Sequence, residues 1–232
     1  MKNLLLPALL SLAALAPARA QSAQTRPVPA FHAIQVGTGI ELALTAGRSQ
    51  RVEVSAAADV YRDHIETTVK DGVLTLRYKN DDDRNNRDRT NKRLRVAVTA
   101  DELTALTASS GSSVRTSGDF DAAEFQLDVS SGASVQAGLD TGTLTVRQSS
   151  GSSADLKGRA TTLDVQSSSG ATFDAHELQT ERCRAQASSG SSVRVAVKDD
   201  LVAQASSGAS VNYKGSPQLT KRTSSGGSVS RD

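Results

Sequence analysis

The chain has 232 residues, with 27 Lys and Arg against 25 Asp and Glu, a net charge of +2. A nearly neutral chain with interspersed charges gives no electrostatic argument for binding nucleic acid or an anionic membrane. One cysteine, Cys183, excludes an internal disulfide, and an aromatic content of 3% argues against a core built on large rings.

Residues 1–20 have the features of a signal peptide. Lys2 supplies a positive charge, residues 4–15 are apolar but too few to cross a bilayer, and Ala18-Arg19-Ala20 offers a cleavage site. We therefore expect cleavage near Ala20 and a periplasmic, secreted or cell-surface location. No later apolar run is long enough for a membrane span.

After a short linker at residues 21–30, residues 31–108 alternate apolar and polar side chains around an Asp71-Gly72 turn. This pattern predicts four to six strands that cap one end of a larger β structure. The polar stretch 79–93 contains Asp81-Asp82-Asp83. Its spacing does not match a calcium loop, so a solvated hairpin tip is the favoured interpretation over a calcium site.

Residues 109–226 contain seven copies of a Ser-Ser-Gly motif. Successive glycines lie 18 to 21 residues apart; they are Gly111, Gly132, Gly151, Gly170, Gly190, Gly208 and Gly226. A fixed period of this length predicts a solenoid in which each coil packs on its neighbours. Glycine tolerates positive φ, so each motif should form a corner.

Apolar residues recur at fixed positions relative to each glycine. Seven residues before it stand Phe125, Leu144, Leu163, Cys183, Leu201 and Leu219; five before it Leu127, Val146, Val165, Ala185, Ala203 and then Lys221; three after it Val114, Val135, Ala154, Phe173, Val193, Val211 and Val229. Spacings of two predict strands, and their polar neighbours Gln126, Asp128, Thr145, Arg147, Asp164 and Gln166 should face water.

We call each set of residues at the same position relative to the glycine a column. The apolar columns predict an all-β, single-stranded parallel β-helix-like solenoid with an N-terminal β cap. Cys183 falls in an apolar column, which favours a small buried hydrophobe over a reactive thiol. Lys221 breaks its column, as a polar terminal coil would. Residues 227–232 are expected to form a C-terminal tail.

These features resemble one bacterial family. The opening Phe31-x-x-Ile34-x-Val36-x-x-Gly39-Ile40-x-Leu42-x-Leu44, the Asp71-Gly72-x-Leu74 turn, the serial Ser-Gly-Ala/Ser-x-Val units and the Tyr213-Lys214-Gly215-Ser216-Pro217 segment resemble the head GIN domain family. The likeness spans about residues 31–226. It implies an exported β-helix-like domain labelled as an autotransporter adhesin head, with no catalytic residues to transfer. The chain offers no room for a C-terminal translocator barrel.

No residue pattern predicts catalysis, a cofactor or a metal site. His32, His64 and His176 are isolated, and no serine stands in a Gly-x-Ser-x-Gly elbow. We therefore expect a non-enzymatic protein and assign no catalytic, cofactor-binding or metal-ligating residue. The enzymatic alternative is a polysaccharide lyase or hydrolase that uses surface charges; the candidates are Asp128, Asp155, Asp164, Asp174 and Arg147.

Two non-enzymatic functions remain open. The polar face of the rod could bind a cell-surface glycan through repeated hydrogen bonds, or the domain could be a periplasmic scaffold that contacts an envelope protein. Tyr61, Tyr78 and Tyr213 are the main candidates for stacking on sugars, and we expect Tyr213 to be at least partly exposed.

Overall fold

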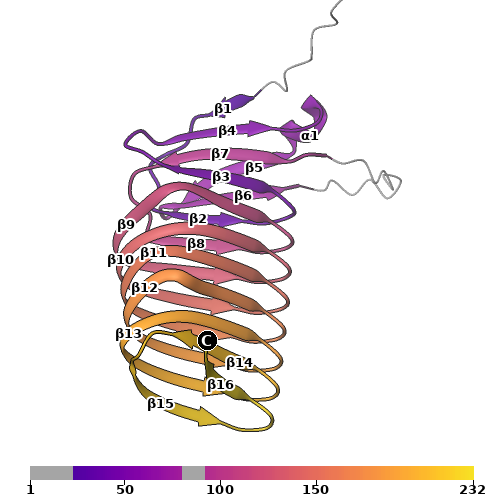
Figure 1. The fold of residues 1–232 in the computed structure, drawn as a ribbon. Helices are drawn as coiled ribbons and strands as arrows, with labels where there is room; N and C mark the ends of the chain where they lie inside the picture. Colours follow the sequence, from indigo (N-terminus) through magenta and orange to yellow (C-terminus); the bar gives the residue numbers. More distant parts are fainter. Residues whose placement is uncertain (1–22, 80–91) are drawn as a thin grey trace, which may run out of the picture.

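The computed structural model describes residues 23–79 and 92–232. The expected signal peptide and the Asp81–Asp83 run lie outside the described residues. Within them, parallel strands stack into a solenoid whose coils follow one another along the sequence (Figure 1). The prediction of a parallel β-solenoid is confirmed.

The N-terminal cap contains more strands than expected. The described part of residues 31–108 contains seven strands, where four to six were expected, and β1 forms within the expected linker. The strands are β1 (Gln24–Arg26), β2 (Ala33–Val36), β3 (Glu41–Ala46), β4 (Arg51–Ser55), β5 (Ile65–Lys70), β6 (Val73–Tyr78), β7 (Arg95–Ala100) and β8 (Ala105–Ala108). β1 and β7 pair antiparallel with β4, while β3 and β8 pair parallel with the first coil. The cap therefore closes one end of the solenoid.

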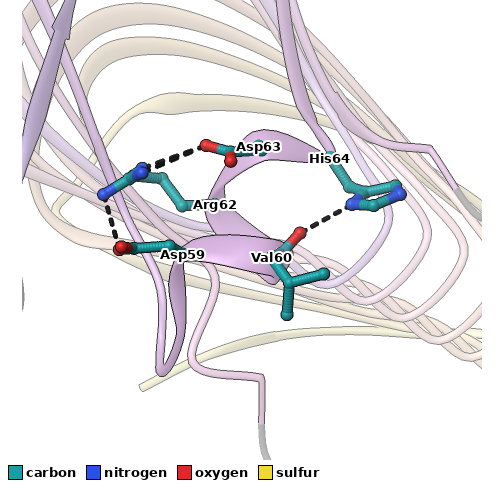
Figure 2. Close-up of polar contacts among 5 residues, drawn as sticks. All are labelled: Asp59, Val60, Arg62, Asp63 and His64. Carbon is teal, nitrogen blue, oxygen red and sulfur yellow. Dashed lines mark hydrogen bonds and ion pairs between the residues drawn. The ribbon is translucent and has the colours of Figure 1, made fainter.

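The cap also holds a short helix, α1 (Asp59–Asp63), that the sequence did not predict. Arg62 bridges Asp59, at 2.7 Å, and Asp63, at 3.1 Å, and the His64 ring contacts the Val60 carbonyl oxygen at 2.6 Å (Figure 2). Five residues are too few to show an apolar period in the sequence. In addition, no residue of α1 is buried, so none had to be apolar. These local contacts fix the turn.

Each central coil is one long strand with a bend in its middle. The strands are β9 (Ser113–Val129), β10 (Ser134–Gln148), β11 (Ser153–Ser167), β12 (Thr172–Ala187) and β13 (Ser192–Ala205), followed by the shorter β14 (Ser210–Lys214), β15 (Gln218–Thr223) and β16 (Ser228–Arg231). We call the parts before and after the bend the first arm and the second arm. Both arms stack in register, as Val135 on Ala154 and Leu144 on Leu163 show.

The Ser-Ser-Gly motifs form the corners that join one coil to the next. The second serine and the glycine both have positive φ, 48–57° and 66–75° across the seven copies. The amide after the glycine donates to the first serine's carbonyl at 2.9–3.3 Å, which closes a β-turn. We expected positive φ at the glycine alone. The small serine side chain tolerates the left-handed region because the turn hydrogen bond holds it there.

An eighth corner starts the column, and the sequence analysis did not identify it. Thr38 and Gly39 have φ of 54° and 70°, and the Gly39 amide donates to the Ser110 carbonyl oxygen at 3.0 Å. The same ladder joins every corner glycine to the second serine of the following corner, from Gly111 to Ser225. The corner of the cap therefore belongs to the same hydrogen-bonded column as the corners of the coils.

The two arms enclose one thin aliphatic core. All the predicted column residues of the central coils are buried, including Cys183. Burial, reinforced by the Asp164 carboxylate, raises the pKa of the Cys183 thiol well above its ordinary value. The prediction of a small buried hydrophobe at Cys183 is confirmed.

The opposite end of the solenoid is open. Every residue of β15 is exposed, and Leu219, the last member of its column, is 37% exposed. In the described part of the chain, β15 pairs only with β13 and β16 only with β14. β16 also occupies most of the segment expected to be a tail. Each of these strands therefore presents an unpaired edge.

Candidate binding groove

A shallow groove runs along the solenoid where the second arms turn into the corners. It encloses about 690 Å³ and spans six coils. We call it the corner groove. Its lining consists of three successive residues from each coil: 128–130, 147–149, 166–168, 186–188, 204–206 and 222–224.

A ladder of long polar side chains follows the groove. Each coil contributes the residue four positions before its corner glycine: Asp128, Arg147, Gln166, Gln186, Gln204 and Arg222. Each pairs in register with the next. Neighbouring strands of a sheet lie about 4.8 Å apart, so the rungs repeat at that spacing. None of the six is fully buried.

The charges of the ladder are partly neutralised inside it. Arg147 lies 3.8 Å from the Asp128 carboxylate, which also accepts from Gln126 at 2.7 Å. With its amide oriented to satisfy both groups, Gln186 accepts from Arg184 at 2.9 and 3.1 Å. The NH₂ group of Gln186 then stays available for other contacts.

Three rungs keep their full hydrogen-bonding capacity. Within the described residues, the side chains of Gln166, Gln204 and Arg222 make no hydrogen bond or ion pair with protein. The ladder therefore offers mostly amide donors and acceptors, with one unpaired guanidinium at its C-terminal end.

Two polar side chains enter the core beneath the groove. Gln148 and Ser167 are 4% and 3% exposed and lie on adjacent coils, in register. The Gln148 Nε2 atom donates to the Thr172 carbonyl oxygen at 3.3 Å. Neither Gln148 Oε1 nor Ser167 Oγ has a hydrogen-bond partner. Both residues line the corner groove.

The acidic residues considered for catalysis do not form one cluster. Asp155 and Asp174 are adjacent on first arms, whereas Asp128 and Asp164 lie on second arms, across the core. Asp174 is held by Arg194 at 3.3 Å. The four carboxylates thus do not share one site, and the adjacent pair Asp155 and Asp174 lies outside the corner groove.

The tyrosines lie away from the corner groove. Tyr61 and Tyr78 are half-buried in the cap, with the Lys92 ammonium 5.7 and 4.4 Å from their ring centres. Tyr213 is half-buried on β14, so its predicted partial exposure is confirmed. None of the three lines the groove, so stacking on tyrosine is not available to a ligand there.

The histidines are separated from one another. His32 packs against Gly72, His64 belongs to the end of α1, and His176 Nε2 lies 3.0 Å from the Asp232 carboxylate. Across residues 23–79 and 92–232, no group of three or more His, Cys, Asp or Glu side chains could hold a metal. No helix in those residues has the length and apolar character to cross a membrane.

Half of the ladder was missed at the sequence level. Asp128, Arg147 and Gln166 were expected to face water, and they do, but Gln186, Gln204 and Arg222 were not grouped with them. The signal was the shared position four residues before each corner glycine. Gln148 and Ser167 carried a weaker signal, as polar residues in a column of small or apolar ones.

Comparison with known proteins finds a family that matches most of the chain. Residues 30–217 match the family described as "Putative auto-transporter adhesin, head GIN domain". A search of curated proteins finds no match.

Three crystal structures of putative adhesins share the fold. One from Bacteroides fragilis is 19% identical, with a TM-score of 0.78 over 93% of this chain and 97% of the other. One from Parabacteroides distasonis is 18% identical, with 0.72 over 92% and 97%. One from Parabacteroides merdae is 15% identical, with 0.70 over 91% and 95%. At these identities the likeness establishes the fold.

Proposed function

The chain belongs to the head GIN domain family, and on this premise we propose that it is an exported, non-catalytic, adhesin-like module whose corner groove binds an extended glycan. The observation that carries the proposal is the ladder from Asp128 to Arg222, in which six coils present one polar side chain each to the same groove. Repeated donors and acceptors at fixed spacing suit a polymer that repeats in the same way.

The spacing of the ladder favours a glycan over a peptide. Rungs about 4.8 Å apart do not match an extended peptide, which advances about 3.3 Å per residue, or a polyproline helix, at about 3.1 Å. One sugar ring of an extended polysaccharide covers a length close to the spacing between two rungs. Each ring could then exchange hydrogen bonds with one coil, and the contacts would add up along the groove.

The distribution of charge favours binding over cleavage. Glycosidases need two carboxyl groups flanking one bond, at about 5–9.5 Å. The corner groove contains a single carboxylate, Asp128, which is already engaged by Arg147 and Gln126. We therefore propose a ligand that is held and not cut.

A glycan array probed with purified residues 21–232 tests this function. The decisive variant replaces the three central rungs together, Gln166→Ala, Gln186→Ala and Gln204→Ala. The wild type should bind defined saccharides, and the variant should lose that signal while keeping its circular dichroism spectrum. Repeating the screen with calcium tests the Asp81–Asp83 run separately.

A matched control changes the same three coils on the other arm. Ser153, Thr172 and Ser192 face outward on the first arms of β11, β12 and β13, and their replacement by alanine should leave the array signal intact. Equal binding by both triple variants would refute the groove as the site. An empty array for the wild type would refute glycan binding itself.

A second candidate function is a scaffold that contacts an envelope protein, and the open end favours it. The unpaired edges of β15 and β16 could accept a strand from a partner. Pull-down from envelope extracts with and without residues 218–232 tests it: a partner captured equally well by both forms would not bind at the open end.

The proposed export has its own test. Mass spectrometry of the protein recovered from the periplasm and the medium should give a mature N-terminus at Gln21. A full-length chain in the cytoplasmic fraction would contradict it.

A further inference from the structure

A second groove runs along the other edge of the second arms, where they begin at the bend. It encloses about 830 Å³ and reaches from β10 to the link between β14 and β15. We call it the bend groove. Its lining consists of residues 140–141, 159–161, 176, 179–181, 196–198 and 214–216, and none of them lines the corner groove.

One row of side chains follows the bend groove from coil to coil. Its members pair in register on successive strands: Asp140, Arg159, Gln179, Ala196 and Lys214. All of them except the half-buried Ala196 are exposed. Because Ala196 is small, the row has a gap between the long side chains of Gln179 and Lys214. A ligand on the surface can therefore reach both cations of the row directly.

These two cations have no partner within the protein. In the described part of the chain, the side chains of Arg159 and Lys214 make no hydrogen bond or ion pair. The remaining charged groups of the groove, Asp140 apart, each lie beside an opposite charge. The distances are 3.7 Å for Glu181 and Arg182, 4.0 Å for Lys198 and Asp199, and 3.0 Å for His176 and Asp232. The groove away from the cap thus has an excess of positive charge.

The same row is acidic on the side of the cap. Asp140 pairs in register with Asp121 on β9, and Asp121 lines a further hollow together with Glu102 and Glu124. No lysine or arginine lines that hollow. The edge of the solenoid therefore changes sign between Asp140 and Arg159, and an anionic polymer is favoured only on the side away from the cap.

The spacing of the two cations matches four sugar rings. Arg159 and Lys214 stand three strands apart, about 14 Å along the solenoid. With one ring on each strand, the first and fourth rings of an extended tetrasaccharide lie beside the two cations. The second and third rings then lie over the Gln179 amide and the Ala196 methyl group.

We propose that the bend groove binds a four-sugar stretch of an anionic glycan, with Arg159 and Lys214 each holding one carboxylate or sulfate group. A guanidinium can donate two parallel hydrogen bonds to either group, and an ammonium attracts both as a point charge. The inference goes beyond the corner groove and does not depend on it. Asp140 repels the next charged ring and so fixes where the bound stretch ends.

The test compares tetrasaccharides that differ in charge alone. Each ring of β-1,4-linked tetramannuronate carries a carboxylate where mannotetraose carries a hydroxymethyl group. Isothermal titration calorimetry on residues 21–232 at low ionic strength should give roughly tenfold tighter binding of tetramannuronate, the effect of two exposed ion pairs. Mannotetraose sulfated at the same position separates the two anionic groups: either charged tetramer supports the site, and the tighter one identifies the group.

Length and charge variants locate the ligand. Dimannuronate reaches only one of the two cations, so it should bind about fivefold more weakly than the tetramer. Lys214→Gln should weaken tetramannuronate binding by roughly three- to fivefold, as should Arg159→Gln. Lys70→Gln is the matched control, because Lys70 is exposed on β5 in the cap and its loss changes the net charge equally. Asp140→Asn should strengthen binding, a gain that misfolding cannot produce.

Four outcomes would overturn the inference. Equal weakening by Lys70→Gln and Lys214→Gln would mean that the ligand responds to overall charge. Equal affinities for dimannuronate and tetramannuronate would refute the span between the two cations. Loss of tetramannuronate binding in the corner-groove triple variant would place the charged ligand in that groove. Failure of both charged tetramers to bind would refute the site and leave the proposed function of the corner groove standing.

Discussion

Two glycines that share positive φ should differ sharply in their tolerance of valine. Gly170, in a corner, has φ of 69° and open space around it, so a side chain there would suffer backbone strain alone. Gly158, at the bend of β11, has φ of 109°, and a Cβ there would overlap the carbonyl oxygen of Leu139 on the neighbouring coil. Valine at Gly170 therefore tests the backbone conformation alone, whereas valine at Gly158 adds a steric clash between the new side chain and the Leu139 backbone.

The expected losses follow from these two differences. Gly170→Val should cost about 2 kcal/mol through a β-branched residue in the left-handed region. Gly158→Val should cost about 3–6 kcal/mol, because strain and overpacking add. For a domain of this size each kcal/mol lowers the melting temperature by roughly 2–4 °C, so thermal unfolding followed by circular dichroism separates the two variants.

One control isolates the role of the corner conformation. Ser169→Gly should lie within about 1 kcal/mol of the wild type, because relief of left-handed strain is offset by greater freedom of the unfolded chain. Equal melting temperatures for the two valine variants would refute the claimed contact at Gly158. An unchanged melting temperature for Gly170→Val would refute the requirement for positive φ at the corners.

Three further outcomes follow from the structure. Because burial raises the pKa of Cys183, the unfolded thiol ionises first; the free energy of unfolding should therefore fall above about pH 9, by up to about 1.4 kcal/mol per pH unit, and urea titrations of Cys183→Ala should lack this component. Lys221→Leu should restore an apolar column at the open end and promote self-association, and a monomer in sedimentation velocity at high concentration would count against an exposed pairing edge. Arg147→Ala should change stability by less than about 1 kcal/mol, since its 3.8 Å pair with Asp128 is largely solvated, but should weaken binding on the array.

The repeats of the solenoid could be predicted because each coil imposes the same steric demands. The columns around Leu144 and Leu163, the corner glycines and the buried Cys183 all followed from alignment on Ser-Ser-Gly. The first corner was missed because Thr38-Gly39 lacks the serines and its partner Ser110 lies far along the chain. β1 and α1 were missed because strands of three residues and helices of five leave no period in a sequence.

The corner groove could be predicted only in part. Alternation showed which side chains face water, but it did not show that the surface is hollow at the residues four before each glycine. That hollow depends on how the second arm turns into the corner, where Ser110 and its equivalents adopt positive φ. The unpaired atoms of Gln148 and Ser167 likewise depend on side-chain geometry that no spacing rule supplies.

The shared corner at Thr38-Gly39 has a consequence for the order of folding. The cap closes only when β3 meets β9, across about seventy residues, whereas every later coil finds its partner within about twenty. Loop closure makes the first step the slow one, and each subsequent coil adds to an existing template. We therefore expect a polarised reaction in which the cap is the nucleus: mutations in β3 should slow refolding, and mutations in β15 should mainly speed unfolding.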